Sequence, residues 1–202
     1  PDHIAALHRV YEGLCFHGLP IGFVTEKSLM DHGLPEDCEL LFMAEVSHLH
    51  EDAVQKLRGL QSRVRMLSYG DSNLCYGARG EVLARDQVAA LNGIRRIAPT
   101  DAINLSKEFE EVLSEHTGKL EVQIAAAGKD HAFGVMQRQV QHDTKTILML
   151  VNVSAQPQQL KLKNREGKPV KAYDLLNREE IESGRLEMAL RQVRLLEISG
   201  KN

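Results

Sequence analysis

The sequence of 202 residues contains no tryptophan and few other aromatic residues, with five phenylalanines and four tyrosines. Open sugar-binding surfaces stack the sugar rings on broad aromatic side chains. The composition therefore disfavours an autonomous sugar-binding surface. An apolar share of 43% and a charged share of 26% are ordinary for a globular chain, which excludes a disordered or fibrous protein.

Several kinds of segment are also missing from the sequence. No apolar run approaches the roughly 18 residues that a membrane-spanning helix needs. No basic start followed by an apolar stretch is visible, so no secretory signal is recognised and a cytoplasmic location is favoured. The formal net charge is −3 and the lysines and arginines form no cluster, which argues against a nucleic-acid partner.

Cysteine is scarce, and its spacing indicates no metal or redox chemistry. Cys15, Cys38 and Cys75 are far apart and form no C-x-x-C pair. The sequence also lacks a glycine-rich phosphate loop, because Gly77-Ala78-Arg79-Gly80 does not have the spacing of a dinucleotide site. We therefore expect three reduced thiols, no metal and no cofactor.

The first half of the chain alternates between helix and strand patterns. Apolar residues at three- and four-residue spacing predict a helix from Ile4 to Cys15, with Asp2 as its N-cap. A further helix begins at Glu51. Apolar runs predict strands, at 19–25, 38–44 and 63–69. More helices are expected at 86–91 and 105–116. This order is typical of a parallel sheet with crossover helices.

From about Gly128 the pattern changes to short strands. Leu160 and Leu162 alternate with glutamine and lysine, which predicts a sheet with one face in water. Six strands are predicted, at 133–141, 146–153, 158–163, 169–175, 185–190 and 193–198. They favour a small antiparallel β-sandwich. The expected fold class is therefore an α/β domain at 1–127 followed by an all-β domain at 128–202.

Polar residues follow two predicted strands, at the edge where open α/β sheets bind ligands. Glu45 and His48 come just after one strand, and Asp71 and Ser72 come just after the next. These four residues are the candidates for a small-molecule site. The alternatives are a capping and turn-forming role for Asp71 and Ser72, and a merely polar loop around His48.

Cys75 is a candidate nucleophile, because it follows a strand of the predicted α/β domain. A nucleophile elbow places the reactive residue directly after the strand and between small neighbours. Here the residues from Gly70 to Leu74 intervene and the bulky Tyr76 follows. No His-x-Glu pair follows that could supply a base and its orienting group. A catalytic Cys75 is thus an alternative to a structural thiol.

The first half resembles the middle domain of family 42 β-galactosidases. The passage from Leu14 to Thr25 is similar to a helix-to-strand passage of that domain. Residues 39–44 and 49–57 are similar to its next strand and helix. In this family the domain has an amidotransferase-like fold, follows a catalytic (β/α)8 barrel and is called the trimerisation domain.

The second half is similar to the β-sandwich that closes many glycoside hydrolases. An N-x-S strand end and a D-L-L strand recur in such domains, and here they are Asn152-Val153-Ser154 and Asp174-Leu175-Leu176. The segments 148–154 and 193–198 carry the rest of this resemblance.

The resemblance implies a non-catalytic accessory and oligomerisation region of a glycosidase that acts in carbohydrate metabolism. The given sequence contains neither the barrel nor its pair of catalytic carboxylates, and it starts after the first strand of the middle domain. We expect it to associate with itself or with an N-terminal catalytic barrel, because separation would expose apolar surface. Two alternatives are a cysteine-dependent amidotransferase-like hydrolase that uses Cys75, and an α/β module that senses a small ligand beside Glu45 and Asp71.

Overall fold

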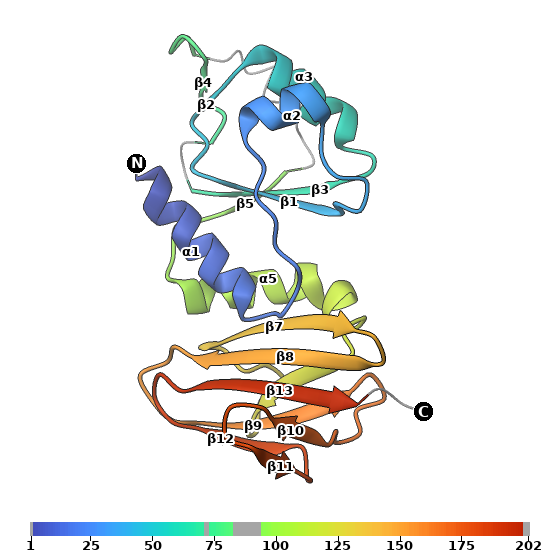
Figure 1. Ribbon diagram of the computed structural model, residues 1–202. Coiled ribbons are helices and arrows are strands. Elements are labelled where there is room, and N and C mark those ends of the chain that lie inside the picture. Colours follow the sequence, from blue (N-terminus) through green and yellow to red (C-terminus); the bar gives the residue numbers. More distant parts are fainter. Residues whose placement is uncertain (1, 71–72, 83–93, 200–202) are drawn as a thin grey trace. The chain divides into compact units, whose positions relative to one another are not determined.

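The computed structural model describes residues 2–70, 73–82 and 94–199, which belong to two compact units (Figure 1). Unit 1 consists of Pro1–Val10 and Gly22–Asp101, and unit 2 consists of Tyr11–Ile21 and Ala102–Asn202. Unit 1 contains parallel strands and unit 2 contains antiparallel strands, so the α/β and all-β classes are confirmed. The domain limits 1–127 and 128–202 stay a prediction.

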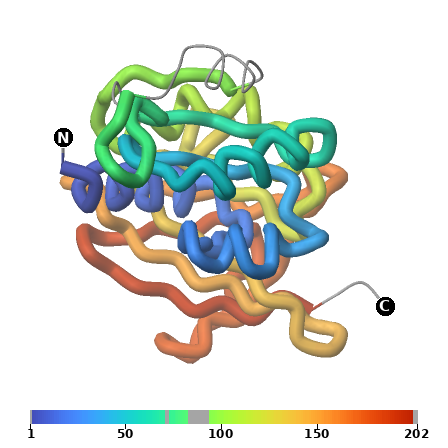
Figure 2. The backbone as a smooth tube through the Cα atoms, turned by 90° about the horizontal axis from the view of Figure 1, so that it is seen from above, coloured from blue at the N-terminus to red at the C-terminus, as the bar shows by residue number. Residues whose placement is uncertain are grey.

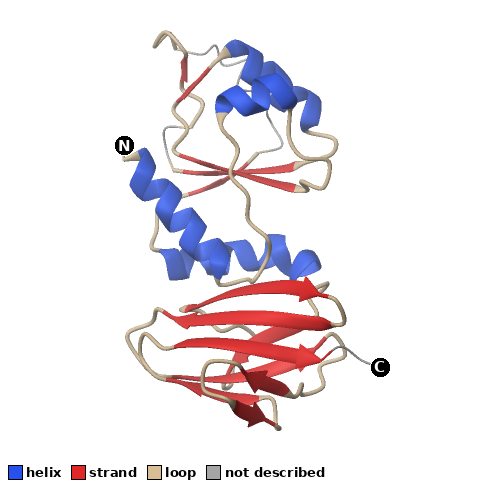
Figure 3. Cartoon of the chain, in the orientation of Figure 1, coloured by secondary structure: helices blue, strands red, loops and turns tan. Residues whose placement is uncertain are grey.

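Unit 1 is built around a parallel sheet. Its strands pair in the order β1-β3-β5, with bounds Leu40–Ala44, Arg65–Tyr69 and Arg95–Ile97. The short strands β2 (His48–Leu49) and β4 (Tyr76–Gly77) form a separate parallel pair. Helices α2 (Glu26–His32) and α3 (Glu51–Leu60) lie side by side over one side of the sheet (Figures 2 and 3).

The core of unit 1 explains why these elements assemble. Leu29 of α2 and Leu57 of α3 are buried together with Met43 of β1 and Met66 of β3. Fully burying a side chain of this kind stabilises the fold by about 1.5–3 kcal/mol. The alternation in β1 and β3 thus places one methionine from each strand under the two helices. The strands predicted at 38–44 and 63–69 and the helix beginning at Glu51 are confirmed.

The strand predicted at 19–25 is wrong. These residues have no regular secondary structure, and Phe23 is 68% exposed. Pro20 has no N–H to donate to a sheet, and Gly22 adds no side chain to pack. The sequence prediction also missed α2, which begins at its N-cap Thr25, whose Oγ1 accepts a hydrogen bond from Ser28 N at 3.1 Å.

Two further helices have the predicted positions. Helix α1 covers His3–Cys15, and Asp2 Oδ1 accepts a hydrogen bond from Ala5 N at 3.1 Å, as an N-cap does. Helix α5 covers Ala102–Thr117, which confirms the helix predicted at 105–116. Within unit 2 a Cβ at Gly13 would lie 3.2 Å from Ala102 O, so a glycine permits this close approach. The helix predicted at 86–91 lies outside the described residues.

Unit 2 contains a sandwich of two antiparallel sheets. The larger sheet has the order β11-β10-β13-β8-β7 and the smaller one the order β12-β9-β6. The bounds are β6 Val122–Ala126, β7 Val135–His142, β8 Lys145–Asn152, β9 Gln158–Asn164, β10 Ala172–Asp174, β11 Glu179–Ile181, β12 Arg185–Met188 and β13 Val193–Ser199. All six predicted strands are present, and β6 and β11 were not predicted. Leu148, Leu150, Leu160, Leu162 and Met188 fill the space between the sheets.

A buried ion pair links β10 to β13. Asp174 is fully buried and accepts hydrogen bonds from Arg194 Nη1 at 2.7 Å and from Leu176 N at 2.9 Å. Burial by itself would raise the pKa of this carboxyl group, but the bonds from Arg194, Asn177 and Leu176 hold the pKa below its usual value. The aspartate of the D-L-L motif therefore has a structural partner.

Candidate functional site

The carboxyl edge of the parallel sheet is the first candidate site, because ligands of open α/β sheets bind there. Glu45 directly follows β1 and Gly70 directly follows β3. Glu45 has a φ of 49° and Gly70 a φ of 104°. The Glu45 carboxylate lies over Gly70, where a Cβ atom would clash with it. The left-handed backbone at Glu45 and the bare glycine thus bring this carboxylate onto the sheet edge.

Asn73 lies at the same edge, and both polar atoms of its side chain form hydrogen bonds within the chain. It is 5% exposed, and its Oδ1 accepts a hydrogen bond from Val46 N at 2.7 Å. Its Nδ2 donates to Tyr69 O at 2.7 Å and to Gly70 O at 3.3 Å. One buried amide therefore joins the loop after β1 to the loop after β3. Sequence reasoning missed Asn73, because nothing in its neighbours indicates these distant partners.

Cys75 lies on the next part of this loop. Its neighbour Leu74 has a left-handed backbone, with a φ of 57°, and is 3% exposed. Cys75 is half-buried, and its Sγ lies 3.7 Å from Asn73 O. The position directly after β3, which an elbow would give to a nucleophile, is Gly70, and Cys75 lies five residues further along the chain.

His48 is exposed and belongs to the β2–β4 pair. Its ring stacks on Tyr76 with 5.0 Å between the ring centroids, and its Nδ1 lies 2.9 Å from Ser47 Oγ. A polar loop residue and a ligand-binding residue could both make these contacts, so the contacts do not decide between the two roles of His48. Asp71 and Ser72, the other two predicted edge residues, lie outside the described residues.

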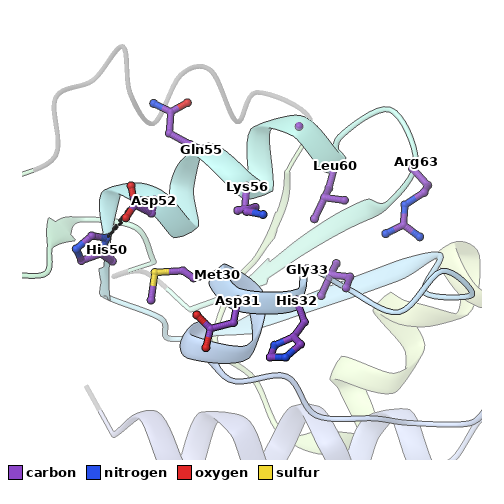
Figure 4. A pocket seen from close by; sticks show the side chains of 12 residues that line it. Met30, Asp31, His32, Gly33, His50, Asp52, Gln55, Lys56, Leu60 and Arg63 are labelled. Carbon is purple, nitrogen blue, oxygen red and sulfur yellow. Dashed lines mark hydrogen bonds and ion pairs between the residues drawn. The ribbon is translucent and has the colours of Figure 1, made fainter.

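A groove between α2 and α3 forms a second candidate site in unit 1, with a volume of about 1030 Å³ (Figure 4). Its lining includes the polar side chains of Asp31, His32, Lys56 and Arg63. Arg63 is held in place because its Nη1 donates to Pro35 O and Glu36 O, at 3.0 and 2.8 Å. Sequence reasoning missed this groove, because α2 itself was not predicted.

His50 stands at the end of this groove and begins α3. Its Nδ1 accepts a hydrogen bond from Asp52 N at 3.2 Å, which makes it the N-cap of the helix. Its own backbone N–H donates to the Glu26 carboxylate at the start of α2. The close-up view shows His50 beside Asp52, away from His32. This histidine therefore fixes the two helices at one end of the groove.

Unit 2 contains a serine and a histidine in contact, an arrangement that resembles part of a hydrolase triad. His17 Nε2 lies 2.9 Å from Ser106 Oγ and 3.0 Å from Ser106 O. Ser106 is fully buried and His17 is 2% exposed, so a substrate does not reach the hydroxyl group. Burial lowers the pKa of His17 to about 4, so the ring is neutral near pH 7. This pair has a structural role.

The described residues contain neither a metal-binding cluster nor a membrane-spanning helix. Residues 2–70, 73–82 and 94–199 contain no group of three or more His, Cys, Asp and Glu side chains that could hold a metal ion. Among the helices in these ranges, none is long and apolar enough to cross a membrane.

Solved structures share the fold of almost the whole chain. The GH42 exo-carrageenase from Bacteroides ovatus matches at 18% identity with a TM-score of 0.67, over 98% of this chain and 27% of that chain. A catalytic mutant of Gan42B, a GH42 β-galactosidase from G. stearothermophilus, matches at 11% identity with a TM-score of 0.70, over 96% and 36%. The β-galactosidase from Bacillus circulans sp. alkalophilus matches at 10% identity with a TM-score of 0.68, over 98% and 38%.

These matches confirm the resemblance in fold to GH42 enzymes. The chain spans between 27% and 38% of the length of these three proteins. At such low identity the likeness concerns the fold alone. No family model matches the sequence, and no curated protein matches it.

Proposed function

We propose that this chain is the non-catalytic accessory and oligomerisation region of a glycoside hydrolase polypeptide related to the GH42 enzymes. It comprises the amidotransferase-like unit that is called the trimerisation domain in that family, followed by the closing β-sandwich. The catalytic barrel belongs to another part of the parent protein. The carbohydrate chemistry is then the task of the parent, and this region holds the protein together.

The observation that carries this proposal is the match of two successive folds within one chain. A single α/β or sandwich domain occurs in many unrelated proteins, so either alone would say little about function. Here both folds occur in order, over 96–98% of the chain, in two proteins described as GH42 enzymes and in a further β-galactosidase. The shared fold covers at most 38% of their length in these three cases, which suits an accessory region.

The sheet edge of unit 1 supports the non-catalytic part of the proposal. Catalysis needs polar groups that are held in place but still free to meet a substrate. Asn73 instead uses its amide on three backbone groups of the protein itself. The left-handed Leu74 is buried. The described part of this edge is thus organised for stability.

An antibody raised against this chain tests the proposal in the source organism. Immunoprecipitation should recover a polypeptide far longer than 202 residues, and the precipitate should hydrolyse a chromogenic glycoside. An antibody against an unrelated abundant protein is the control. Recovery of a free chain of this length, without hydrolase activity, would contradict the proposed role.

The groove between α2 and α3 favours a second candidate, a module that senses a small ligand. Its volume of about 1030 Å³ is at the upper end of ordinary ligand pockets. A sugar or nucleotide that binds only the folded state at 100 times its Kd should stabilise the chain by about 2.7 kcal/mol. Thermal unfolding against a panel of sugars and nucleotides would show it. Lys56→Ala should abolish the shift, and Lys107→Ala on α5 should keep it. A flat response across the panel removes this candidate.

A further inference from the structure

The acidic groups of the groove between α2 and α3 are compensated within the chain. Four of the residues that line the groove carry a fixed charge near neutral pH, namely Asp31, Asp52, Lys56 and Arg63. Asp31 Oδ2 lies 2.6 Å from Lys27 Nζ, so this carboxylate has a basic partner on its own helix. Asp52 stands in the first turn of α3, where the positive end of the helix dipole stabilises a carboxylate.

Lys56 has no such compensation. It forms no ion pair with any residue in the ranges 2–70, 73–82 and 94–199. Asp52 precedes it by four residues, a spacing that allows an ion pair on a helix. Figure 4 shows the Asp52 carboxylate turned toward His50 instead, with 3.4 Å between Oδ2 and Nδ1. The ammonium group of Lys56 is exposed beside the groove with its full charge.

Arg63 is held in place without being neutralised. Its Nη1 donates to the carbonyl oxygens of Pro35 and Glu36, which carry no net charge. The side chains of Glu36 and Asp37, the acidic residues of this loop, are exposed and do not line the groove. The two hydrogen bonds therefore orient the guanidinium group and leave its charge uncompensated. An arginine fixed in this way loses less side-chain freedom when it binds a ligand.

The end of α3 does not cancel these two charges. The last carbonyl groups of a helix carry a partial negative charge of about half a unit in total, which is small beside two full positive charges. Leu60 O also accepts hydrogen bonds from Arg63 N and Val64 N, at 3.0 and 2.8 Å. This part of the groove is therefore basic, whereas the end with His50 and Asp52 is not.

Apolar side chains line the same part of the groove. Leu34 is 8% exposed and Leu60 is half-buried. Lys56, Leu60 and Arg63 follow one another along the wall that α3 and its end provide (Figure 4). Residues four apart on a helix share a face, which places Leu60 next to Lys56. The site thus combines two basic groups with a small apolar surface.

We propose that this part of the groove binds a small phosphomonoester, with its phosphate between Lys56 and Arg63 and its organic body on Leu34 and Leu60. A phosphomonoester carries a charge of about −1.5 to −2 at pH 7, which matches two uncompensated positive charges. A carboxylate would neutralise only one of them. Arginine offers a fork of donors to two phosphate oxygens, and lysine adds a point charge. The inference names the ligand class for the ligand-sensing candidate and rests on it.

Three ligands with the same sugar ring test the charge. Glucose, glucuronate and glucose 6-phosphate carry no charge, one negative charge and about two negative charges at neutral pH. In isothermal titration calorimetry of the purified chain, the Kd should be at least about tenfold lower for glucose 6-phosphate than for glucuronate, because charge-assisted hydrogen bonds are strong. A tenfold rise in NaCl concentration should weaken the binding. Glucuronate that binds as tightly as glucose 6-phosphate overturns the proposal.

AMP, adenosine and inorganic phosphate identify the organic body. AMP that binds more tightly than glucose 6-phosphate assigns the site to nucleotides, and the reverse order assigns it to sugar phosphates. The better ester should bind more tightly than inorganic phosphate, because Leu34 and Leu60 contact its body. Inorganic phosphate that binds as tightly as both esters contradicts a seat for the body. The proposal is wrong if neither ester binds.

Variants of one lysine locate the site. Lys56→Gln removes one of the two charges and should raise the Kd of the better ester at least fivefold. Lys56→Arg keeps the charge and should restore the Kd to within twofold of the unchanged chain. Lys107→Gln, at an exposed position of α5, is the matched control and should bind as the unchanged chain does. Circular dichroism during thermal unfolding shows whether each variant is folded. An unchanged Kd in a folded Lys56→Gln variant contradicts the site.

The outcomes separate this inference from the functions on which it bears. If glucose or adenosine binds as tightly as its phosphate ester, the phosphate site is refuted and a module that senses a neutral ligand remains. If no ligand of the panel binds, the phosphate site and the ligand-sensing candidate are both refuted. The accessory role is judged separately by the immunoprecipitation.

Discussion

The sheet edge of unit 1 and the outer sheet face of unit 2, which is the side of β7, β8 and β13 turned away from the sandwich core, differ in how their side chains are used. At the edge they form hydrogen bonds within the chain, and on the face they stay exposed. At the edge, the buried Asn73 side chain joins the loops after β1 and β3 through three hydrogen bonds. On the outer face, Met149 and Val193 keep 40% and 44% of their surface exposed, within a row of apolar neighbours. The described part of the edge where α/β proteins perform chemistry is thus held by the protein's own hydrogen bonds, whereas the outer face keeps apolar side chains exposed. This difference is what the proposed accessory role leads us to expect.

Two neighbouring residues of β8 give the largest expected effect on this comparison. Leu150 is fully buried between the two sheets, so Leu150→Ala should lower the free energy of unfolding by about 4 kcal/mol through lost burial and a cavity. Met149→Ala on the outer face should cost below about 1 kcal/mol in the monomer. Urea unfolding at a concentration where both variants are monomeric measures the difference. Equal losses would show that the outer face is already packed.

Acid should weaken unit 2 through His17. The pKa of the buried ring is lowered to about 4 from 6.5, so the unfolded chain binds the proton more readily than the folded chain. The stability present above pH 6.5 should therefore fall as the pH drops, reach a loss of about 3 kcal/mol near pH 4, and change no further below it.

Urea unfolding of the chain and of His17→Gln between pH 7.5 and 4 measures this effect. The variant should lose the part of the pH dependence that His17 contributes. His142→Gln replaces a histidine whose side chain is 76% exposed, and it should keep the dependence of the unchanged chain. The same pH dependence in His17→Gln and the unchanged chain would disagree with a buried neutral ring.

Removal of the Asn73 side chain should open the sheet edge of unit 1. Asn73→Ala leaves Val46 N without its bond and should cost about 2 kcal/mol, with water replacing part of the loss. Hydrogen exchange in β1 and β3 should become faster, while β8 stays protected. Asn104→Ala, at an exposed position on α5, is the matched control. Unchanged exchange in β1 and β3 would show that the edge does not depend on Asn73.

The smallest effect is expected at Cys75. Cys75→Ser should change the free energy of unfolding by less than about 0.5 kcal/mol, because the thiol makes one weak contact of 3.7 Å with Asn73 O. Labelling of the native chain with iodoacetamide, followed by peptide mapping, should show Cys75 reacting no faster than free glutathione. A much faster reaction would favour the cysteine hydrolase and would contradict a non-catalytic sheet edge in unit 1.

Local sequence patterns predicted most elements of both units. Their apolar residues recur at the spacing that a helix or a strand buries on one face. Examples are the helix at 4–15, the strand at 38–44 and the alternation around Leu160. The strand at 19–25 failed because an apolar run does not by itself specify pairing, and Phe23 is mostly exposed. Helix α2 was missed because its seven residues are mainly polar and its N-cap Thr25 is its main signal.

The candidate sites were less predictable than the fold. Glu45 was placed correctly at the sheet edge, since any residue that follows a parallel strand lies there. The bonds of Asn73 join it to Val46, 27 residues away, and no local pattern encodes such a pair. The outer face likewise depends on the register of β7, β8 and β13, which aligns Arg138, Met149 and Leu195 only after folding.

The most direct test of the central claim is hydrolysis of chromogenic galactosides by the purified chain, beside a GH42 β-galactosidase at equal molar concentration. We predict a rate equal to that of buffer alone for the chain, over pH 5 to 8, in both its monomeric and associated forms. A saturable rate above this background, lowered by Glu45→Gln or by Cys75→Ser in a folded variant, would show that the chain carries catalytic groups of its own and would contradict a role in assembly alone.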